Sequence, residues 1–504
     1  MGSGIDPLVA RVRRLNEAAE RGKGADYVLY WMNACRRPGW SFALEHAVAE
    51  AARVKKPLLV FEPLRVGYKW ASDRLHAFVL AGMAANAEAF AERGVRYFAY
   101  VEPEAGAGSG LLEALAARAA VVITDDFPAF FLPRMVAAAA ARLDVRLEAV
   151  DGNGLVPMRA TEIVYPTAYA FRRHLQKTLP EHLVALPRAD PLGSVGKLGL
   201  AELPRGVAKK WPEATGTALL GGEGAAAQRA ALAKLPIDHT VAPVAGWFGE
   251  GGFAAARKRL KKFVRDGLDR YAEGRRDPDT EDGSSGFSAW LHFGHLSPHE
   301  VFHAIAKHED WDPSKIRGYA HAKGKKEGFW GMRPDAEAYL DELVTWREVG
   351  FNFCALRGED YDRYESLPEW ARKTLDEHAH DARDEGYTHA QLERAETEDP
   401  IWNAAQRQLV AEGRIHNYLR MLWGKKILEW TPSPRAALAS MVELNNRYAL
   451  DGRDPNSYSG IFWCLGRYDR PWAPKRKIFG TIRYMSSAST RRKLELTEYL
   501  EKWG

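Results

Sequence analysis

Segment 399–459 combines hydrogen-bonding side chains with regularly spaced tryptophans. Asn417 and Arg420 lie three residues apart, so they share one face if the segment is helical. Trp423 and Trp430 would lie on one stripe of that helix, two turns or roughly 10 Å apart. This arrangement could hold a flat, hydrogen-bonding ligand. It could equally be an ordinary helical core in which tryptophan fills space, and the spacing alone leaves both interpretations open.

Two helices in series, followed by a polar loop, are predicted to position these residues. Asp399 is a good N-cap and Gly413 a good C-terminal stop for the first helix, which carries Trp402. The second helix covers about 415–430 and ends before a Thr-Pro pair. The Asp-, Asn-, Arg- and Gly-rich stretch 445–456 is predicted to be a loop that presents many hydrogen-bonding groups.

The sequence of this segment closely resembles the flavin-binding core of class II cyclobutane pyrimidine dimer (CPD) photolyases, in the photolyase/cryptochrome family. The sequence motifs that carry the resemblance are WNAAQ, HNYLRMLW, KKILEW, LNNRY and LDGRDPN, in that order. It extends to YWMNACRRPGWSFALEHAV near the N-terminus, SGFSAWLHFGHLSPHEVF in the middle and FGTIRYMSSASTRRK near the end. It covers nearly the whole chain and is weakest between about residues 180 and 245.

The resemblance implies a deoxyribodipyrimidine photolyase, a carbon–carbon lyase that repairs pyrimidine dimers in DNA under light. Photoexcited, fully reduced FAD would pass an electron to the flipped-out dimer, the cyclobutane ring would split, and the electron would return. In such an enzyme the cofactor carries the difficult chemistry, and the protein supplies position and electrostatics. Flipping is required because a dimer stacked in the duplex cannot reach a buried flavin.

Four residues of segment 399–459 are expected to bind the cofactor. The resemblance implies that Arg420 and Asp451 flank the isoalloxazine ring and that Asn445 faces its redox-active edge, while Asn417 also bonds the cofactor. A neutral amide such as Asn445 can adapt its hydrogen bonding to different redox states more easily than a carboxylate. A buried structural salt bridge is the alternative for Arg420 and Asp451, and both interpretations can hold together.

Three tryptophans match the electron-transfer tryptophans of the family. The resemblance implies that Trp423 is nearest the flavin, that Trp402 is next, and that Trp430 is a further member. The chain has 16 tryptophans, and flat aromatics also serve simply as core. The residues expected to act in catalysis are Glu342, Asn445, Trp402, Trp423 and Trp430.

A serine-rich loop, GSSGFS at 283–288, leads into a predicted helix. Small residues let a backbone approach a phosphate, and a helix N-terminus offers free N–H groups. By itself the pattern fits a solvent loop with a helix cap better. The resemblance implies that this loop cradles the flavin diphosphate, through Ser284, Ser285, Gly286 and Ser288.

Glu342 and Trp346 lie four residues apart on a predicted helix and therefore share a face. Spacing alone favours a surface glutamate beside a core tryptophan. The resemblance implies instead that Glu342 hydrogen-bonds the lesion, with Trp346 and Trp463 packed against it. It also implies that Arg483 enters the space vacated by the flipped dimer. A plain phosphate contact or a surface salt bridge is the alternative for Arg483.

Residues 25–178 are predicted to form an α/β domain with an open parallel, Rossmann-like sheet. Short apolar runs alternate with Ala-rich helical patterns, as in βαβ units. The predicted strands are 26–31, 57–62, 95–102, 120–126 and 145–151, and the main predicted helices are 41–54, 72–93 and 128–142. No G-x-G-x-x-G fingerprint follows the first strand, so an ordinary dinucleotide site is not predicted there. Some family members hold a second, antenna chromophore in this domain, and no sequence feature names one here.

The remaining domain boundaries follow from changes in composition. Residues 1–24 form an N-terminal extension, and residues 179–247, rich in Gly, Ala, Pro and Leu, form a linker. Residues 248–504 read as nearly all helical and are predicted to bind FAD and DNA.

The charge of the chain fits a nucleic-acid partner, with a formal net charge of +5. Basic residues cluster at 257–263, 323–326, 475–477 and 490–493, and such clusters can follow a phosphate backbone. A solvated helix face is the alternative for each cluster. The expected partner is UV-damaged, double-stranded DNA, and the protein is expected to act as a monomer.

Three scattered cysteines are too few for a disulfide framework, which favours a reducing cytoplasm of bacterial or archaeal type. No apolar run reaches the ~18 residues of a membrane span, and no signal peptide is visible. His292, His295 and His299 have helical spacing, but Pro298 separates them and no cysteine or carboxylate cluster completes a site, so no metal is expected.

Three other functions stay open. A cryptochrome-like photoreceptor would share the flavin and the tryptophans without repairing DNA, whereas Glu342, Trp346 and Trp463 favour repair. Repair of (6-4) photoproducts generally relies on a lesion-pocket histidine that cannot be placed here. A non-enzymatic nucleic-acid-binding module would carry no flavin. One departure concerns lesion affinity, since WREVGFNF follows Glu342 where many class II enzymes are more basic.

Overall fold

The structure is a computed structural model that describes residues 8–193, 195–280 and 283–504. The chain forms two compact units that are each discontinuous in sequence. Unit 1 takes in the described part of Met1–Ala160, together with Pro180–Leu260 and Phe287–Ala304. Unit 2 comprises Thr161–Leu179, the described part of Lys261–Gly286, and Ile305–Gly504. The two units interleave along the chain, whereas the domains predicted from composition are continuous.

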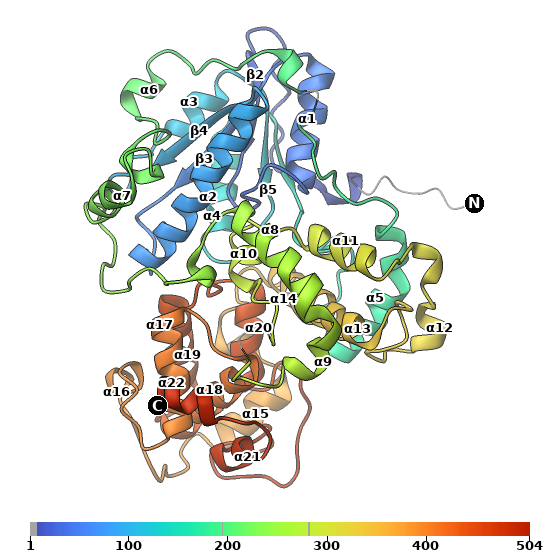
Figure 1. The fold of residues 1–504 in the computed structure, drawn as a ribbon, viewed down its shortest axis with the longest axis vertical. Coiled ribbons are helices and arrows are strands. Elements are labelled where there is room, and N and C mark those ends of the chain that lie inside the picture. The colour runs from blue at the N-terminus through green and yellow to red at the C-terminus, as the bar shows by residue number, and fades with distance from the viewer. Residues whose placement is uncertain (1–7, 194, 281–282) are drawn as a thin grey trace. The chain divides into compact units, whose positions relative to one another are not determined.

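Unit 1 is built on a six-stranded sheet in the order β1-β6-β5-β2-β3-β4. Figure 1 labels four of these strands, β2 to β5. Its strands are β1 (Val12–Arg14), β2 (Tyr27–Trp31), β3 (Leu58–Leu64), β4 (Arg96–Val101), β5 (Ala119–Asp125) and β6 (Leu147–Val150). The five predicted strands are present and pair in parallel. The edge strand β1 pairs antiparallel with β6 and falls in the stretch predicted as an N-terminal extension.

Helices cover both faces of this sheet, because alternate strand residues point to opposite faces. On one face Val28 and Val60 pack with the helices α1 (Phe42–Val54) and α2 (Asp73–Glu92). On the other face Leu29 and Phe61 pack with α3 (Leu111–Ala116) and α4 (Leu132–Ala140). The sequence of each central strand is therefore an almost unbroken run of apolar residues, as expected for a parallel sheet buried on both sides.

The segment predicted as a linker adds to both of these cores. It contains α6 (Val207–Lys210) and α7 (Ala225–Leu232), where little regular structure was expected. Leu192 belongs to the core beneath α1 and α2, and Trp211 to the core beneath α3. The rest of unit 1 includes most of α8 (Phe253–Lys262), α10 (Ser288–His292) and the start of α11 (Pro298–His308).

The described part of unit 2 is helical and holds none of the strands of the sheet. Its α-helices are α5 (Ala168–His182, whose last residues belong to unit 1), α9 (Tyr271–Gly274), α12 (Gly318–Ala322), α13 (Pro334–Leu340), α14 (Arg347–Leu356), α15 (Glu369–Glu377), α16 (His389–Glu393), α17 (Pro400–Glu412), α18 (Asn417–Trp430), α19 (Pro434–Tyr448), α20 (Pro455–Cys464), α21 (Ser487–Arg491) and α22 (Thr497–Trp503). No helix among the described residues is long and apolar enough to cross a membrane.

The helices α17 and α18 begin and end as predicted. The Asp399 carboxylate accepts hydrogen bonds from the first free N–H groups of α17, and Gly413 ends that helix in the left-handed conformation, with φ of 66°. The tight packing of α18 depends on Gly424, because a Cβ there would lie 2.5 Å from the Cys464 Sγ on α20.

Two local predictions are wrong. The stretch 445–456 is not one loop, because α19 continues through Asn445 to Tyr448 and α20 begins at Pro455. The helix predicted to carry Glu342 and Trp346 is interrupted by a π-helical segment, Asp341–Trp346, which places both residues outside regular α-helix. Such π segments are often found at functional sites.

Candidate functional site

Arg420 and Asp451 form an ion pair in unit 2, with 3.2 Å between Arg420 Nη2 and Asp451 Oδ1. Arg420 extends from α18, and Asp451 lies in the short turn between α19 and α20. The side chains are 17% and 14% exposed, so the pair is sheltered but still reachable by a ligand. Because the ion pair fixes both side chains, the guanidinium donors and the carboxylate acceptors lie side by side in defined directions.

Asn445 lies at the end of α19 and is 2% exposed. Its Nδ2 donates hydrogen bonds to Ser457 Oγ at 2.8 Å and to Asn446 Oδ1 at 3.2 Å. The following turn is held by Arg453, a buried residue with positive φ whose guanidinium bonds the carbonyl oxygens of that turn, including Leu450 at 3.2 Å. The sequence analysis did not single out Arg453, because only its buried position distinguishes it from a surface arginine.

The three predicted electron-transfer tryptophans are brought together. The rings of Trp402 and Trp423 are parallel within 1°, with centroids 6.5 Å apart. Trp430 meets Trp402 edge to face at 5.4 Å. The indole N–H of Trp402 donates to the Trp423 carbonyl, and that of Trp423 donates to Gln406 Oε1. These bonds satisfy buried polar groups and fix both ring planes.

The serine-rich loop is divided between the two units. Ser284, Ser285 and Gly286 belong to unit 2, where Tyr339 Oη donates to Ser285 Oγ over 3.4 Å. Gly286 has φ of 72°, a conformation that favours glycine. Ser288 is the first residue of α10 and belongs to unit 1.

Glu342 pairs with a residue that the sequence analysis did not identify. Arg275 Nη1 lies 2.7 Å from Glu342 Oε1, and the side chains are 26% and 27% exposed. The carbonyl oxygen of Arg275 lies 3.0 Å from His416 Nε2, immediately before α18. Asn417, the next residue, is exposed at the start of α18. No signal in the sequence connects Arg275 with Glu342, since the two residues are far apart along the chain.

Trp463 and Arg483 lie together in unit 2. Arg483 bonds Asp469 at 2.8 Å and 3.1 Å, and its Cζ lies 4.0 Å from the ring centroid of Trp472 and 5.5 Å from that of Trp463. Lys425 approaches the Trp463 ring with its Nζ 4.9 Å from the centroid. Trp346 is partly buried at the end of the π segment. The predicted lesion-pocket residues thus have neighbours, Asp469, Trp472 and Lys425, that sequence analysis missed.

The three histidines considered for a metal have other surroundings. His295 Nδ1 accepts the backbone N–H of Gly252 at 2.9 Å, while His292 and His299 pack edge to face on phenylalanine rings. A different group, Asp269, His308 and Glu309, has metal-like spacing among the described residues, but Arg333 bonds both of its carboxylates.

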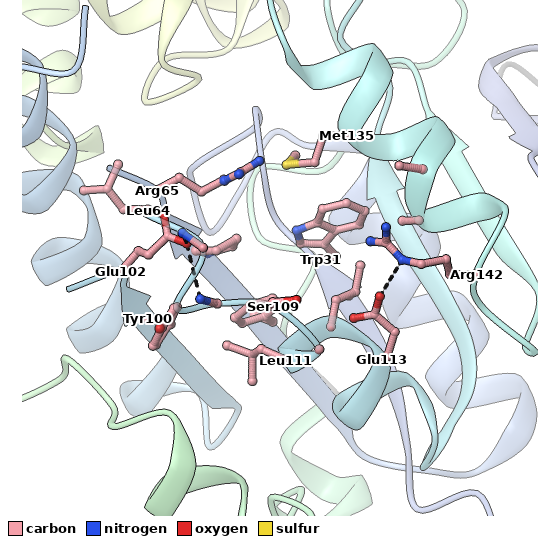
Figure 2. A pocket seen from close by; sticks show the side chains of 18 residues that line it. Trp31, Leu64, Arg65, Tyr100, Glu102, Ser109, Leu111, Glu113, Met135 and Arg142 are labelled. Carbon is pink, nitrogen blue, oxygen red and sulfur yellow. Dashed lines mark hydrogen bonds and ion pairs between the residues drawn. The ribbon is translucent and has the colours of Figure 1, made fainter. Parts of the chain in front are cut away.

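Unit 1 contains a cavity of about 640 Å³ at the carboxyl ends of β2, β3 and β4 (Figure 2). Its walls are mainly apolar and include Trp31, Leu64 and Met135, and Tyr100 and Ser109 supply hydroxyl groups. The Trp31 Nε1 is buried and has no hydrogen-bond partner among the described residues. Ligands bind open α/β sheets at this edge, and a buried N–H without an acceptor indicates that a ligand or water completes it.

Comparison with solved structures identifies the class of fold. A cryptochrome from Synechocystis sp. superposes with a TM-score of 0.66 at 14% identity, covering 95% of this chain and 88% of that one. A bacterial class III photolyase from Agrobacterium tumefaciens gives a TM-score of 0.63 at 16% identity, covering 95% and 86%. The protein therefore has the photolyase/cryptochrome fold, as predicted.

Relatives of higher identity identify the family. The deoxyribodipyrimidine photo-lyase of Methanothermobacter thermautotrophicus is 33% identical over 493 residues, which is 98% of this chain and 97% of that protein. The enzyme of the same name from Oryza sativa subsp. japonica is 32% identical over 97% of this chain and 90% of its own length. No family model matches the chain. The chain belongs to the deoxyribodipyrimidine photolyase family.

Proposed function

We propose that the protein is a class II photolyase that repairs cyclobutane pyrimidine dimers in double-stranded DNA under light. The observation that carries the proposal is the set of three contacting indoles on α17 and α18. One of them, Trp423, lies three residues after Arg420, which forms the ion pair with Asp451. Indoles in contact suit the movement of single electrons, and the hydrogen bonds of Trp402 and Trp423 hold their two rings parallel. Family membership supports the same reaction.

FAD is the cofactor that these residues fit. The buried His416 Nδ1 has no hydrogen-bond partner among the described residues, and it lies just before Asn417 at the start of α18. A buried polar atom left open beside polar side chains is typical of an incomplete ligand site. The residues proposed to hold FAD are Ser284, Ser285, Gly286, Ser288, Asn417, Arg420, Asn445 and Asp451. When bound, FAD would supply a light-excited, one-electron donor.

The residues of the chain would bind and orient the dimer. Glu342, held by Arg275, offers carboxylate acceptors to the polar edge of the flipped bases. Trp346 and Trp463 offer flat apolar surfaces on which those bases can pack. Asn445 offers a neutral amide whose hydrogen bonding adapts without a change of charge. Dimer-containing sites cost less to unstack than intact duplex, which helps this pocket to select damage.

A second chromophore is proposed for unit 1, in the cavity at the carboxyl edge of the sheet. The Trp31 N–H, which has no acceptor within the described part of the chain, the hydroxyl groups and the apolar walls suit a planar molecule that carries hydrogen-bond acceptors. Arg142 and Glu113 pair at the rim of the cavity (Figure 2). An absorption band other than that of flavin in the purified protein, lost in Trp31→Phe, would support this assignment.

Two measurements on the purified protein test the main proposal. Acid denaturation followed by chromatography should release FAD, and absence of flavin from well-folded protein would contradict the proposal. Illumination with a reductant should then restore thymine-dimer DNA to undamaged DNA. Flavin without repair of either dimers or (6-4) photoproducts would indicate a photoreceptor instead, and repair of (6-4) photoproducts alone would correct the substrate. We expect a monomer that works in the cytoplasm.

A further inference from the structure

Lys425 is a buried cation in contact with the residue proposed as one wall of the lesion pocket. It lies on α18 and is 1% exposed. Its Nζ donates a 2.7 Å hydrogen bond to the carbonyl oxygen of Cys464, the last residue of α20. The same Nζ lies 4.9 Å from the ring centroid of Trp463. One ammonium group therefore contacts both the end of α20 and the indole next to it.

The buried position of Lys425 disfavours the charged form of its amine. Burial lowers the pKa of Lys425 to about 8, because removal from water disfavours the ammonium form. A methionine of similar length would fill the same space without that cost. A group that is unfavourable for stability and adjacent to a proposed substrate pocket is a candidate for function.

Three charged or titratable groups face Lys425 from the elements packed against it: Cys464 on α20, and Asp469 and Arg483 beyond that helix. Burial raises the pKa of the Cys464 thiol to about 11. Although burial acts in the opposite direction, hydrogen bonds from Arg483 and Trp472 hold the pKa of Asp469 below its usual value. Neither Cys464 nor Asp469 therefore changes charge near neutral pH, and Lys425 is the group here that does.

We propose that Lys425 is a positioning residue that holds Trp463 for dimer binding, and that loss of its proton weakens the preference for damaged DNA. The ammonium donates a charge-assisted hydrogen bond to the end of α20 and attracts the π face of the indole. A neutral amine makes both interactions more weakly, so the indole loses a fixed orientation. The inference rests on the proposed function, because Trp463 is a lesion contact only if the chain binds dimers.

The test compares binding to two labelled duplexes of the same sequence, one with a single thymine dimer and one without. The preference is the ratio of the two dissociation constants, measured by fluorescence anisotropy in the dark at constant ionic strength. In the wild type it should fall as pH rises from about 7 to about 9, through the pKa of Lys425. Lys425→Met should lower the preference about tenfold at the lower pH and remove the pH dependence.

Three further variants separate positioning from general damage to the fold. Lys426→Met is the matched control, since Lys426 is the next residue of α18 and pairs with Glu429 rather than contacting Trp463. It should keep the wild-type ratio and its pH profile. Lys425→Arg keeps a positive charge through this range and should give a flat profile even if Lys425→Met fails to fold. In a Trp463→Phe background, Lys425→Met should have much less effect, because the two residues act together.

Each opposing outcome overturns the inference. A wild-type profile retained in Lys425→Met or in Lys425→Arg would show that Lys425 is not the titrating group. An equal loss of affinity for both duplexes in Lys425→Met would show a structural role only. Additive effects of Lys425→Met and Trp463→Phe would exclude action through the indole. If the wild type shows no preference for the dimer at any pH, the proposed function itself fails.

Discussion

Two buried tryptophans, Trp402 and Trp423, lie with parallel rings whose centroids are 6.5 Å apart. Each is held at two points, by packing of the ring and by a hydrogen bond from its indole N–H. Exposed fractions of 0% and 2% exclude water from the pair, which lowers the reorganisation that accompanies a change of charge. The proposed electron path therefore depends on single side chains, and single substitutions test it.

We expect Trp423→Phe to slow or abolish photoreduction of oxidised flavin while repair by chemically pre-reduced enzyme stays largely intact. The substitution removes the oxidisable indole, and in the proposed mechanism the electron for repair passes from the flavin to the dimer without this path. Flavin photoreduction and dimer repair are measured in parallel, with flavin content checked first. Trp503→Phe, in the C-terminal helix α22, is the control and should behave as wild type. Equal loss of both activities in Trp423→Phe would remove the assigned role.

Arg483 presents a second test at the residue scale. Its ion pair with Asp469 and its stacking on Trp472 hold the guanidinium in one orientation, beside Trp463. We expect Arg483→Ala to lose affinity mainly for dimer-containing DNA, since a guanidinium in the vacated space meets both unpaired bases and phosphates. Binding isotherms at several salt concentrations on damaged and intact duplex provide the measurement.

The control for Arg483 is Lys475→Ala, which removes an exposed cation that pairs with Glu377. A substitution that removes only a phosphate contact should weaken binding to both duplexes alike and reduce the salt slope by about one. The same behaviour in Arg483→Ala would leave only the phosphate role.

At the scale of elements, the close approach of α14 and α20 depends on one glycine. A Cβ on Gly350 would lie 2.5 Å from Ser459 Oγ and 2.8 Å from the Pro455 carbonyl oxygen. The second atom belongs to the backbone of α20, so a side chain on residue 350 must push the helices apart. Gly350, within the WREVGFNF stretch that follows Glu342, is thus required by the packing of these two helices.

We expect Gly350→Ala to lower the free energy of unfolding by about 1–3 kcal/mol through overpacking. Gly460→Ala is the matched control, because it lies within α20 and a Cβ there would meet only Met421 Cε at 3.8 Å. That substitution should be neutral or stabilise by up to about 1 kcal/mol, since alanine favours helix over glycine. Urea denaturation of both variants measures the difference, and equal effects would contradict this account of the packing.

At the scale of the whole molecule, buried histidines make stability depend on pH. Burial lowers the pKa of His295 to about 3 and that of His76 to about 4, from a usual value of 6.5. As pH falls below about 6.5, both histidines become protonated in the unfolded chain, whereas in the folded protein they stay neutral until the pH approaches their lowered pKa values. Stability contributed by the neutral imidazoles is therefore lost progressively as pH falls towards their folded pKa values.

We expect the free energy of unfolding to fall between pH 7 and pH 5, by up to about 1.4 kcal/mol per pH unit for each such histidine. His295→Asn should reduce this slope, because an amide oxygen can accept the Gly252 N–H without titrating in this range. Urea denaturation at several pH values provides the slopes. An unchanged slope in the variant would show that His295 does not contribute.

The sequence by itself determined the features that depend on neighbouring residues and on periodic burial. The five parallel strands follow from apolar runs buried on both faces, and α17 follows from its Asp399 cap and Gly413 stop. The family could also be assigned from short sequence motifs, because the similarity to relatives extends along nearly the whole chain. These signals come from residues that are close together in the sequence, so they can be recognised without knowledge of the fold.

Only the tertiary structure decided the contacts between distant segments. Arg275 pairs with Glu342, Lys425 reaches Cys464, and Arg453 holds the turn after α19, each through side chains that look like surface residues in the sequence. Asn445 belongs to a helix rather than to the expected loop, and Glu342 and Trp346 lie in a π-helical segment. Packing against other helices sets these outcomes, because buried polar groups must find partners wherever the fold supplies them.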